Sequence, residues 1–107
     1  MAASDPGVLL AIRDRLVSAL HPNKIVLFGS RARGDARPDS DYDLLIVSDE
    51  PGSWTELHVA ARRALSDLHV SKDVVVLTTA EYAKYRRWLS HIAAVADREG
   101  QVLYEAA

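Results

Sequence analysis

Three short apolar runs, separated by segments with helical spacing, constrain the fold of this chain more than any other feature. The runs are Lys24–Phe28, Tyr42–Val47 and Asp73–Leu77, and each is rich in β-branched or aromatic residues and bounded by turn residues. Short runs of this kind predict β-strands. Because Asp73–Leu77 is almost continuous in valine, we expect it to be a central strand that is covered on both faces.

Segments with apolar residues three or four positions apart flank these runs and predict helices. Asp5-Pro6 has the form of an N-cap followed by a first-turn proline, and the helix that it opens ends near His21-Pro22. Ser53-Trp54-Thr55-Glu56 is a capping box and opens another helix. The predicted buried stripe of that helix is Trp54, Leu57, Ala61, Leu65 and Leu68.

The remaining segments complete the expected architecture. The polar segment Arg31–Arg37 predicts a short helical turn, and Thr78–Arg98 predicts a helix that is broken or bent near Trp88–Ser90. Gly100 stops that helix, and Gln101–Tyr104 is either a last short strand or a docked tail. The order of elements predicts one α/β or α+β domain over residues 1–107, with a small mixed sheet of three to four strands and helices packed on it.

Composition excludes several classes of protein. The chain has 107 residues, a formal net charge of −2 and no cysteine, so neither disulfides nor thiolate metal sites are available. A near-neutral chain does not predict direct nucleic-acid binding. The segment Met1–Gly7 lacks a basic region followed by an apolar one, and the apolar runs are too short to cross a bilayer. We therefore expect a cytoplasmic protein without membrane segments.

Two aspartates separated by one residue lie at the start of the second apolar run, and another aspartate begins the third run. Strand alternation places Asp41 and Asp43 on one face, with Cα atoms about 6.5 to 7 Å apart, and Asp73 joins them if the two strands are neighbours. Two such charges 4 Å apart repel by about 4 kcal/mol at an effective dielectric of 20. A divalent cation removes this conflict, and oxygen ligands favour Mg²⁺ or Mn²⁺. The cluster therefore predicts two-metal phosphoryl or nucleotidyl transfer.

A glycine-serine turn supplies the groups for the phosphates. Gly29 ends the first apolar run and lets the backbone approach a phosphate closely, and Ser30 offers an N–H and a hydroxyl at the start of a helical turn. Arg31 and Arg33 follow at once, and we expect either of them to meet phosphate, solvent or an acidic partner. Arg33 is the candidate for nucleotide binding.

These residues resemble a known superfamily. Gly29-Ser30, ten intervening residues, Asp41-Tyr42-Asp43 and the later Asp73 are similar to the nucleotidyltransferases typified by DNA polymerase beta. The fuller pattern, Gly29–Gly34 leading to Ser40–Leu44, and the closing segment Arg98–Glu105 resemble the minimal, MNT-type members.

The resemblance implies a polymerase beta-like fold and a role for each matching residue. Asp41 and Asp43 would bind both of two Mg²⁺ ions, with Mn²⁺ as an alternative. Asp73 would bind the catalytic metal and help to deprotonate the attacking hydroxyl. Gly29 and Ser30 would hold the triphosphate of ATP.

The resemblance also implies a partner. MNT-type proteins are commonly encoded beside helical HEPN proteins, as antitoxin and toxin, and some transfer AMP from ATP to a tyrosine of a HEPN ribonuclease toxin. We therefore expect a magnesium-dependent enzyme whose acceptor hydroxyl arrives on a HEPN-type protein, with an oligomer within that complex as a further expectation. Two alternatives stay open: an antitoxin that acts by binding alone, and a small-molecule (antibiotic) nucleotidyltransferase that is completed by oligomerisation.

Other polar and aromatic residues have simpler interpretations. Asp35 and Asp39 fall outside the strand alternation and are expected in turns. The histidines show no metal-ligand spacing; they are His21, His58, His69 and His91. The Arg86-x₄-His91 spacing resembles the ribonuclease motif of HEPN proteins, but three predicted strands do not fit a helical bundle. Tyr82, Tyr85 and Trp88 are expected in helix packing or in a partner-facing patch.

Overall fold

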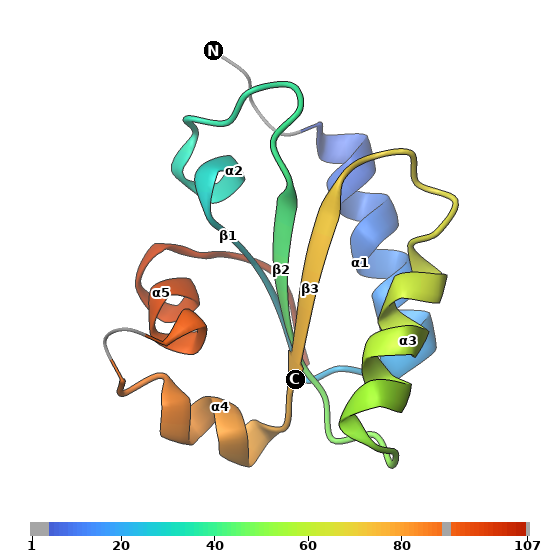
Figure 1. The fold of residues 1–107 in the computed structure, drawn as a ribbon, viewed down its shortest axis with the longest axis vertical. Coiled ribbons are helices and arrows are strands. Elements are labelled where there is room, and N and C mark those ends of the chain that lie inside the picture. Colours follow the sequence, from blue (N-terminus) through green and yellow to red (C-terminus); the bar gives the residue numbers. More distant parts are fainter. Residues whose placement is uncertain (1–4, 89–90, 107) are drawn as a thin grey trace.

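A four-stranded mixed sheet forms the centre of the molecule (Figure 1). The computed structural model describes residues 5–88 and 91–106. The strands lie in the order β3-β2-β1-β4, and their bounds are β1 Lys24–Phe28, β2 Tyr42–Val47, β3 Lys72–Leu77 and β4 Gln101–Glu105. β1 pairs antiparallel with β2 and with β4, whereas β2 and β3 are parallel. The predicted mixed sheet of an α+β fold is confirmed.

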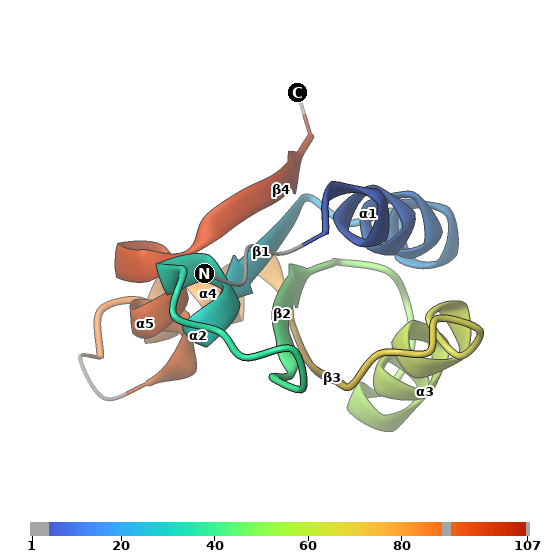
Figure 2. The ribbon, with the colours of Figure 1, turned by 90° about the horizontal axis from the view of Figure 1, so that it is seen from above.

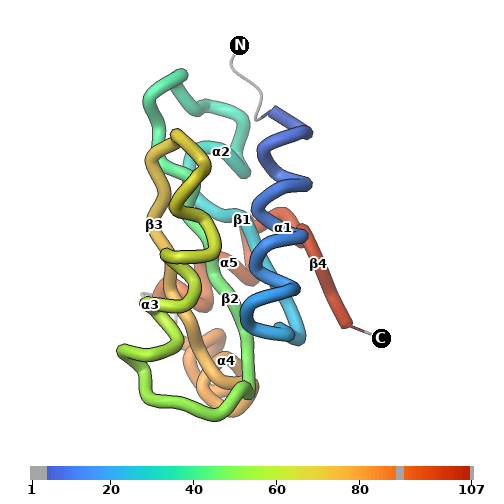
Figure 3. Tube along the Cα trace, turned by 90° about the vertical axis from the view of Figure 1, so that its right-hand side faces the viewer, coloured from blue at the N-terminus to red at the C-terminus, as the bar shows by residue number. Residues whose placement is uncertain are grey.

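Two layers of helices cover the sheet (Figures 1 and 2). α1 (Pro6–Leu20) and α3 (Trp54–Ala64) pack on one face and lie side by side in Figure 3. α4 (Thr79–Tyr85) and α5 (Ile92–Glu99) pack on the other face, and the short helix α2 (Ser30–Arg33) follows β1. Because strand side chains alternate, each inner strand contributes to both layers: Leu44 and Ile46 face α1 and α3, while Leu45 and Val47 face α4 and α5.

The prediction that Asp73–Leu77 forms a central strand is wrong, because β3 lies at the edge of the sheet. Val74 and Val76 are buried against the α1 and α3 layer, and Val75 packs partly buried against the other. A run of valines therefore indicates that both faces of a strand are covered, and it says nothing about its two edges. At the outer edge of β3, one backbone group finds a side-chain partner: the Val76 N–H donates a hydrogen bond to Nε2 of His58 at 3.1 Å.

The local capping signals are confirmed. Asp5 Oδ1 accepts a bond from the Gly7 N–H at 2.8 Å, with Pro6 as the first residue of α1. Ser53 and Glu56 form both bonds of the capping box of α3. α1 ends at Leu20, and the next residue, His21, takes a left-handed conformation with φ 44°.

The predicted burial of Trp54 is wrong, because its side chain is 66% exposed. Trp54 is the first residue of α3, and its indole stacks on the ring of His58 with centroids 3.9 Å apart. It therefore shields that histidine from outside instead of entering the core. Ala61 and Leu65 of the predicted stripe are fully buried, and Leu57 and Leu68 pack partly buried against them.

The C-terminal third follows the prediction. α4 and α5 flank the expected break, and positions 89 and 90 lie outside the described residues. Gly100 caps α5, and a Cβ at that position would clash with Val26 and with the Ala96 carbonyl. The segment after Gly100 is the strand β4 and not a docked tail. None of the helices in the described part of the chain is long and apolar enough to cross a membrane.

His58 offers a test of how the edge strand is held. The His58 side chain is 5% exposed, and Nδ1 lies 2.8 Å from the Trp54 carbonyl while Nε2 accepts from Val76. We expect His58→Ala to lower the free energy of unfolding by about 1–3 kcal/mol, since it leaves a buried N–H unpaired. Urea unfolding measures this, with Val59→Ala on the exposed side of α3 as the control. Equal effects of the two substitutions would contradict a special role for His58.

Candidate active site

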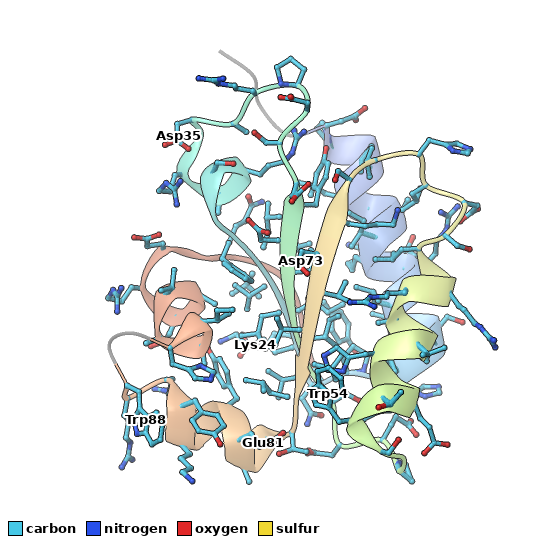
Figure 4. All side chains as sticks on the ribbon, in the orientation of Figure 1. Lys24, Asp35, Trp54, Asp73, Glu81 and Trp88 are labelled. Carbon is cyan, nitrogen blue, oxygen red and sulfur yellow. The ribbon has the colours of Figure 1, made fainter. Side chains whose placement is uncertain are left out.

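Two of the three predicted carboxylates lie directly beside each other. In the parallel pairing of β2 and β3, Asp43 is the register partner of Asp73, and on its other side Asp43 lies opposite Phe28 of β1. Neighbouring strands are about 4.8 Å apart, and in-register residues project from the same face. Asp43 and Asp73 therefore project to the face that carries α4 and α5. Figure 4 labels Asp73 on its strand.

Asp41 lies just before β2 and is exposed, as is Asp73, whereas Asp43 is half-buried. Tyr42, between the two aspartates, is buried on the opposite face of the sheet. Tyr42 and Asp43 therefore face opposite sides of the sheet, whereas Asp41 lies outside β2. This arrangement leaves one carboxylate in the sheet, between β1 and β3, and one at its rim.

The strand-ending glycine allows Asp43 to take its place. Gly29 has φ 76° and ψ −157°, a conformation found almost only for glycine. A Cβ at this position would collide with Oδ2 of Asp43. The Asp43 carboxylate thus lies against the turn that begins α2, so that the metal-binding and phosphate-binding parts of the predicted site are in direct contact.

The electrostatics of Asp43 reflect this crowding. Burial raises the pKa of the Asp43 carboxyl, and the negative charges of Asp73 and then Asp41 raise it further, while Arg33 lowers it. All three carboxylates and Arg33 are therefore close enough to act on one group. A cation at this place would favour the ionised form and oppose the repulsion.

The donor set fits a hard divalent cation. Carboxylate oxygens are the ligands that Mg²⁺ and Mn²⁺ prefer, and Asp43 and Asp73 place two of them in register. Within residues 5–88 and 91–106, however, no group of three or more His, Cys, Asp and Glu side chains converges as a metal-ligand cluster. Mutual repulsion between the carboxylates favours such a spread, and the exposed side chains of Asp41 and Asp73 are free to turn.

Arg33 lies at the edge of the site. Its Nε is 3.4 Å from Oδ2 of Asp35, and its Nη1 is 3.7 Å from Oε1 of Glu99 at the end of α5. These long, exposed ion pairs contribute little to stability. The Arg33 side chain therefore stays available to an anion beside Gly29 and Ser30. Glu99 was not among the predicted site residues, although it belongs to the closing segment that supported the family resemblance.

The Arg31 side chain is engaged with the loop that follows α2. Its guanidinium donates to backbone carbonyls of the following loop and stacks over the ring of Tyr42. Of the two arginines whose roles the sequence left open, Arg31 is thus engaged in the fold and Arg33 faces the site.

Gly29→Ala tests the contact between the turn and Asp43. We expect a loss of about 1–3 kcal/mol in the free energy of unfolding, because alanine strains this backbone conformation. The new methyl group must also displace the Asp43 carboxylate. Gly34→Ala is the matched control, since Gly34 also has positive φ, at 85°, but a Cβ there meets nothing within 4 Å. Chemical unfolding of both variants, with NMR of the Asp43 carboxyl, measures the two effects; an unmoved Asp43 would contradict the contact.

Asp43→Asn tests the crowding of charge. A raised pKa means that the folded protein binds the Asp43 proton more tightly than the unfolded chain, so the ionised group destabilises the fold at neutral pH. Without divalent cations we expect Asp43→Asn to raise the free energy of unfolding by roughly 0.5 kcal/mol, the low end of the range for removing unfavourable surface charge, because solvent screens a half-buried carboxylate. This gain should vanish in acid. A loss of stability at pH 7 would contradict the repulsion.

Comparisons with known proteins agree with this geometry. Residues 9–98 match the family model of the nucleotidyltransferase domain. Comparison with curated protein sequences gives no match.

Solved structures share the fold. A toxin–antitoxin crystal structure with AMP-PNP aligns at a TM-score of 0.68 and 20% identity, covering 92% of this chain and 73% of the other. A putative nucleotidyltransferase from Sulfolobus solfataricus aligns at 0.62 and 22% identity, covering 91% and 78%. A complex of the tri-AMPylated Shewanella oneidensis HEPN toxin with its MNT antitoxin aligns at 0.52 and 16% identity, covering 92% and 73%. With the family match over most of its length and the paired aspartates beside a glycine-serine turn, the chain belongs to the nucleotidyltransferase domain family.

Proposed function

We propose that this protein is a magnesium-dependent nucleotidyltransferase that transfers AMP from ATP to a hydroxyl of a HEPN-type toxin, most simply a tyrosine, and thereby acts as its antitoxin. The observation that carries the proposal is the in-register pair Asp43 and Asp73, set against the Gly29 turn. The family match supports nucleotidyl transfer. The AMPylated toxin in one structural neighbour supports this choice of nucleotide and acceptor.

Each part of the site would have its own role. Gly29 and Ser30 would hold the triphosphate through backbone N–H groups and the serine hydroxyl at the start of α2. Arg33 would neutralise phosphate charge from the side of α5. Asp41, Asp43 and Asp73 would hold two Mg²⁺ ions, which when bound neutralise developing charge and align the attacking and leaving oxygens.

The chemical step uses Asp73 as the base. The acceptor oxygen bonds to the α-phosphorus of ATP, the bond from that phosphorus to the bridging oxygen breaks, and pyrophosphate leaves. A tyrosine hydroxyl has an ordinary pKa of about 10, so it needs a carboxylate to take its proton at neutral pH. Asp73 suits this role because it is exposed at the edge strand, where an acceptor can approach from solvent.

Transfer of labelled AMP tests the proposal. The protein is incubated with a purified HEPN-type protein, Mg²⁺ and ATP labelled at the α-phosphate. We expect label on the partner, reduced at least about 100-fold by Asp43→Ala, because metal ligation supplies several kcal/mol of transition-state stabilisation. Asp39→Ala is the matched control, since Asp39 is an exposed turn aspartate in the loop that precedes β2.

The outcomes separate the candidate functions. Label with wild type and Asp39→Ala, but not with Asp43→Ala, supports the enzyme. If none of the four nucleoside triphosphates gives label on the partner, the proposal of an enzyme is contradicted. Neutralisation of the toxin without label would favour an antitoxin that acts by contact alone.

A further inference from the structure

The ten residues between Ser30 and Asp41 fold around one guanidinium group. Arg31 Nε donates to the Ser40 carbonyl at 3.1 Å, and Nη2 donates to the same carbonyl at 2.9 Å. Nη2 also donates to the carbonyl of Pro38 at 3.1 Å and, more weakly, to that of Arg37 at 3.4 Å. One side chain from α2 therefore gathers three carbonyls of the loop that leads into β2.

The other side of the guanidinium rests on an aromatic ring. The Arg31 Cζ lies 4.1 Å from the centroid of Tyr42, whose side chain is 3% exposed and belongs to the core under α1 and α3. The loop also closes on itself, since Ser40 Oγ accepts from the Arg37 N–H and the Ser40 N–H donates to the Arg37 carbonyl. Arg31 is thus anchored to the core and holds the loop against it.

These contacts fix the backbone on both sides of Asp41. The carbonyl of Ser40 and the amide nitrogen of Asp41 belong to one planar peptide unit, so the two Arg31 bonds orient the plane that precedes Asp41. The plane that follows is held by the Tyr42 N–H, which donates to the Ser71 carbonyl at 2.9 Å. The Asp41 side chain is exposed, yet its main chain is fastened at both ends.

We propose that Arg31 is a positioning residue for Asp41: it ties the helix that begins at the phosphate turn to the loop that presents the first metal ligand. This role rests on the proposed function, because it matters only if Asp41 binds a metal ion. Arg31 acts through the Ser40–Asp41 peptide and touches neither metal nor nucleotide.

Lysine cannot replace arginine in this position. Arg31 needs two donors in one plane for the Ser40 carbonyl, and a flat face for Tyr42. A lysine ammonium keeps the charge but has neither the planar fork nor the stacking surface. Arg31→Lys therefore removes the geometry while preserving the electrostatic field at the site.

Binding of Mn²⁺ tests the proposal without relying on catalysis. Free Mn²⁺ is measured by electron paramagnetic resonance while the full chain is titrated with Mn²⁺ and an ATP analogue that has a methylene group between the α- and β-phosphates. We expect Arg31→Lys to weaken Mn²⁺ binding about 10–100-fold, the usual effect of losing a group that orients a metal ligand. Arg37→Lys, the same exchange at an exposed position of the same loop, should leave Mn²⁺ affinity unchanged.

A double-mutant cycle separates positioning from general stability. If Arg31 acts only through Asp41, then Arg31→Lys has no further effect on Mn²⁺ affinity in an Asp41→Asn background. A full additional loss in that background would overturn the proposal, as would an unchanged affinity in the single variant. Arg31→Gln is the second variant, and it is compared with wild type under conditions in which both proteins are folded to the same extent. We expect it, too, to weaken Mn²⁺ binding in the wild-type background and to have no further effect in the Asp41→Asn background.

The result also distinguishes this role from the proposed function. Wild-type protein that binds Mn²⁺ and the analogue, with Arg31→Lys binding equally well, overturns the role of Arg31 and leaves the nucleotidyltransferase proposal standing. Wild-type protein that binds neither overturns both.

Discussion

The parallel, in-register pairing of β2 with β3 is the constraint on which the site depends, because it sets Asp43 beside Asp73. Two carboxylates in this arrangement repel each other, and the raised pKa of Asp43, caused by burial and then by Asp73 and Asp41, is the consequence. A fold tolerates such a conflict when it serves a ligand that relieves it. The hydrophobic layers on both faces hold the two strands in place, so the aspartates cannot separate by moving their backbones.

The remaining parts of the site are arranged around this pair. Gly29 has no side chain where the Asp43 carboxylate lies, and α2 begins at that point, so phosphate and metal groups would meet there. Arg31 holds the loop that carries Asp41, while Arg33 is only weakly paired and faces the site. The two arginines of this basic segment thus differ: Arg31 is bound within the fold, and Arg33 is the one that we propose for the anion.

Local signals in the sequence predicted much of this structure. The N-cap at Asp5, the capping box at Ser53 and the end of α5 at Gly100 depend on residues a few positions apart, so the sequence alone predicts them. The alternation of Tyr42 and Asp43 along β2 is also a local signal. The edge position of β3 and the exposure of Trp54 depend on partners far along the chain, which spacing does not identify. The contacts of Arg31 with the loop carbonyls were missed because the sequence does not show how the loop turns back.

The central claim is that divalent cations bind at Asp41, Asp43 and Asp73, with the triphosphate on the Gly29-Ser30 turn. The most direct measurement is a crystal structure with Mn²⁺ and a non-hydrolysable ATP analogue, using the anomalous signal of manganese to locate the ions. The account predicts anomalous density within coordination distance of the Asp43 carboxylate, bridged to phosphate oxygens beside Gly29. Manganese or triphosphate bound elsewhere on the sheet, with Asp43 and Asp73 uncoordinated, would contradict it.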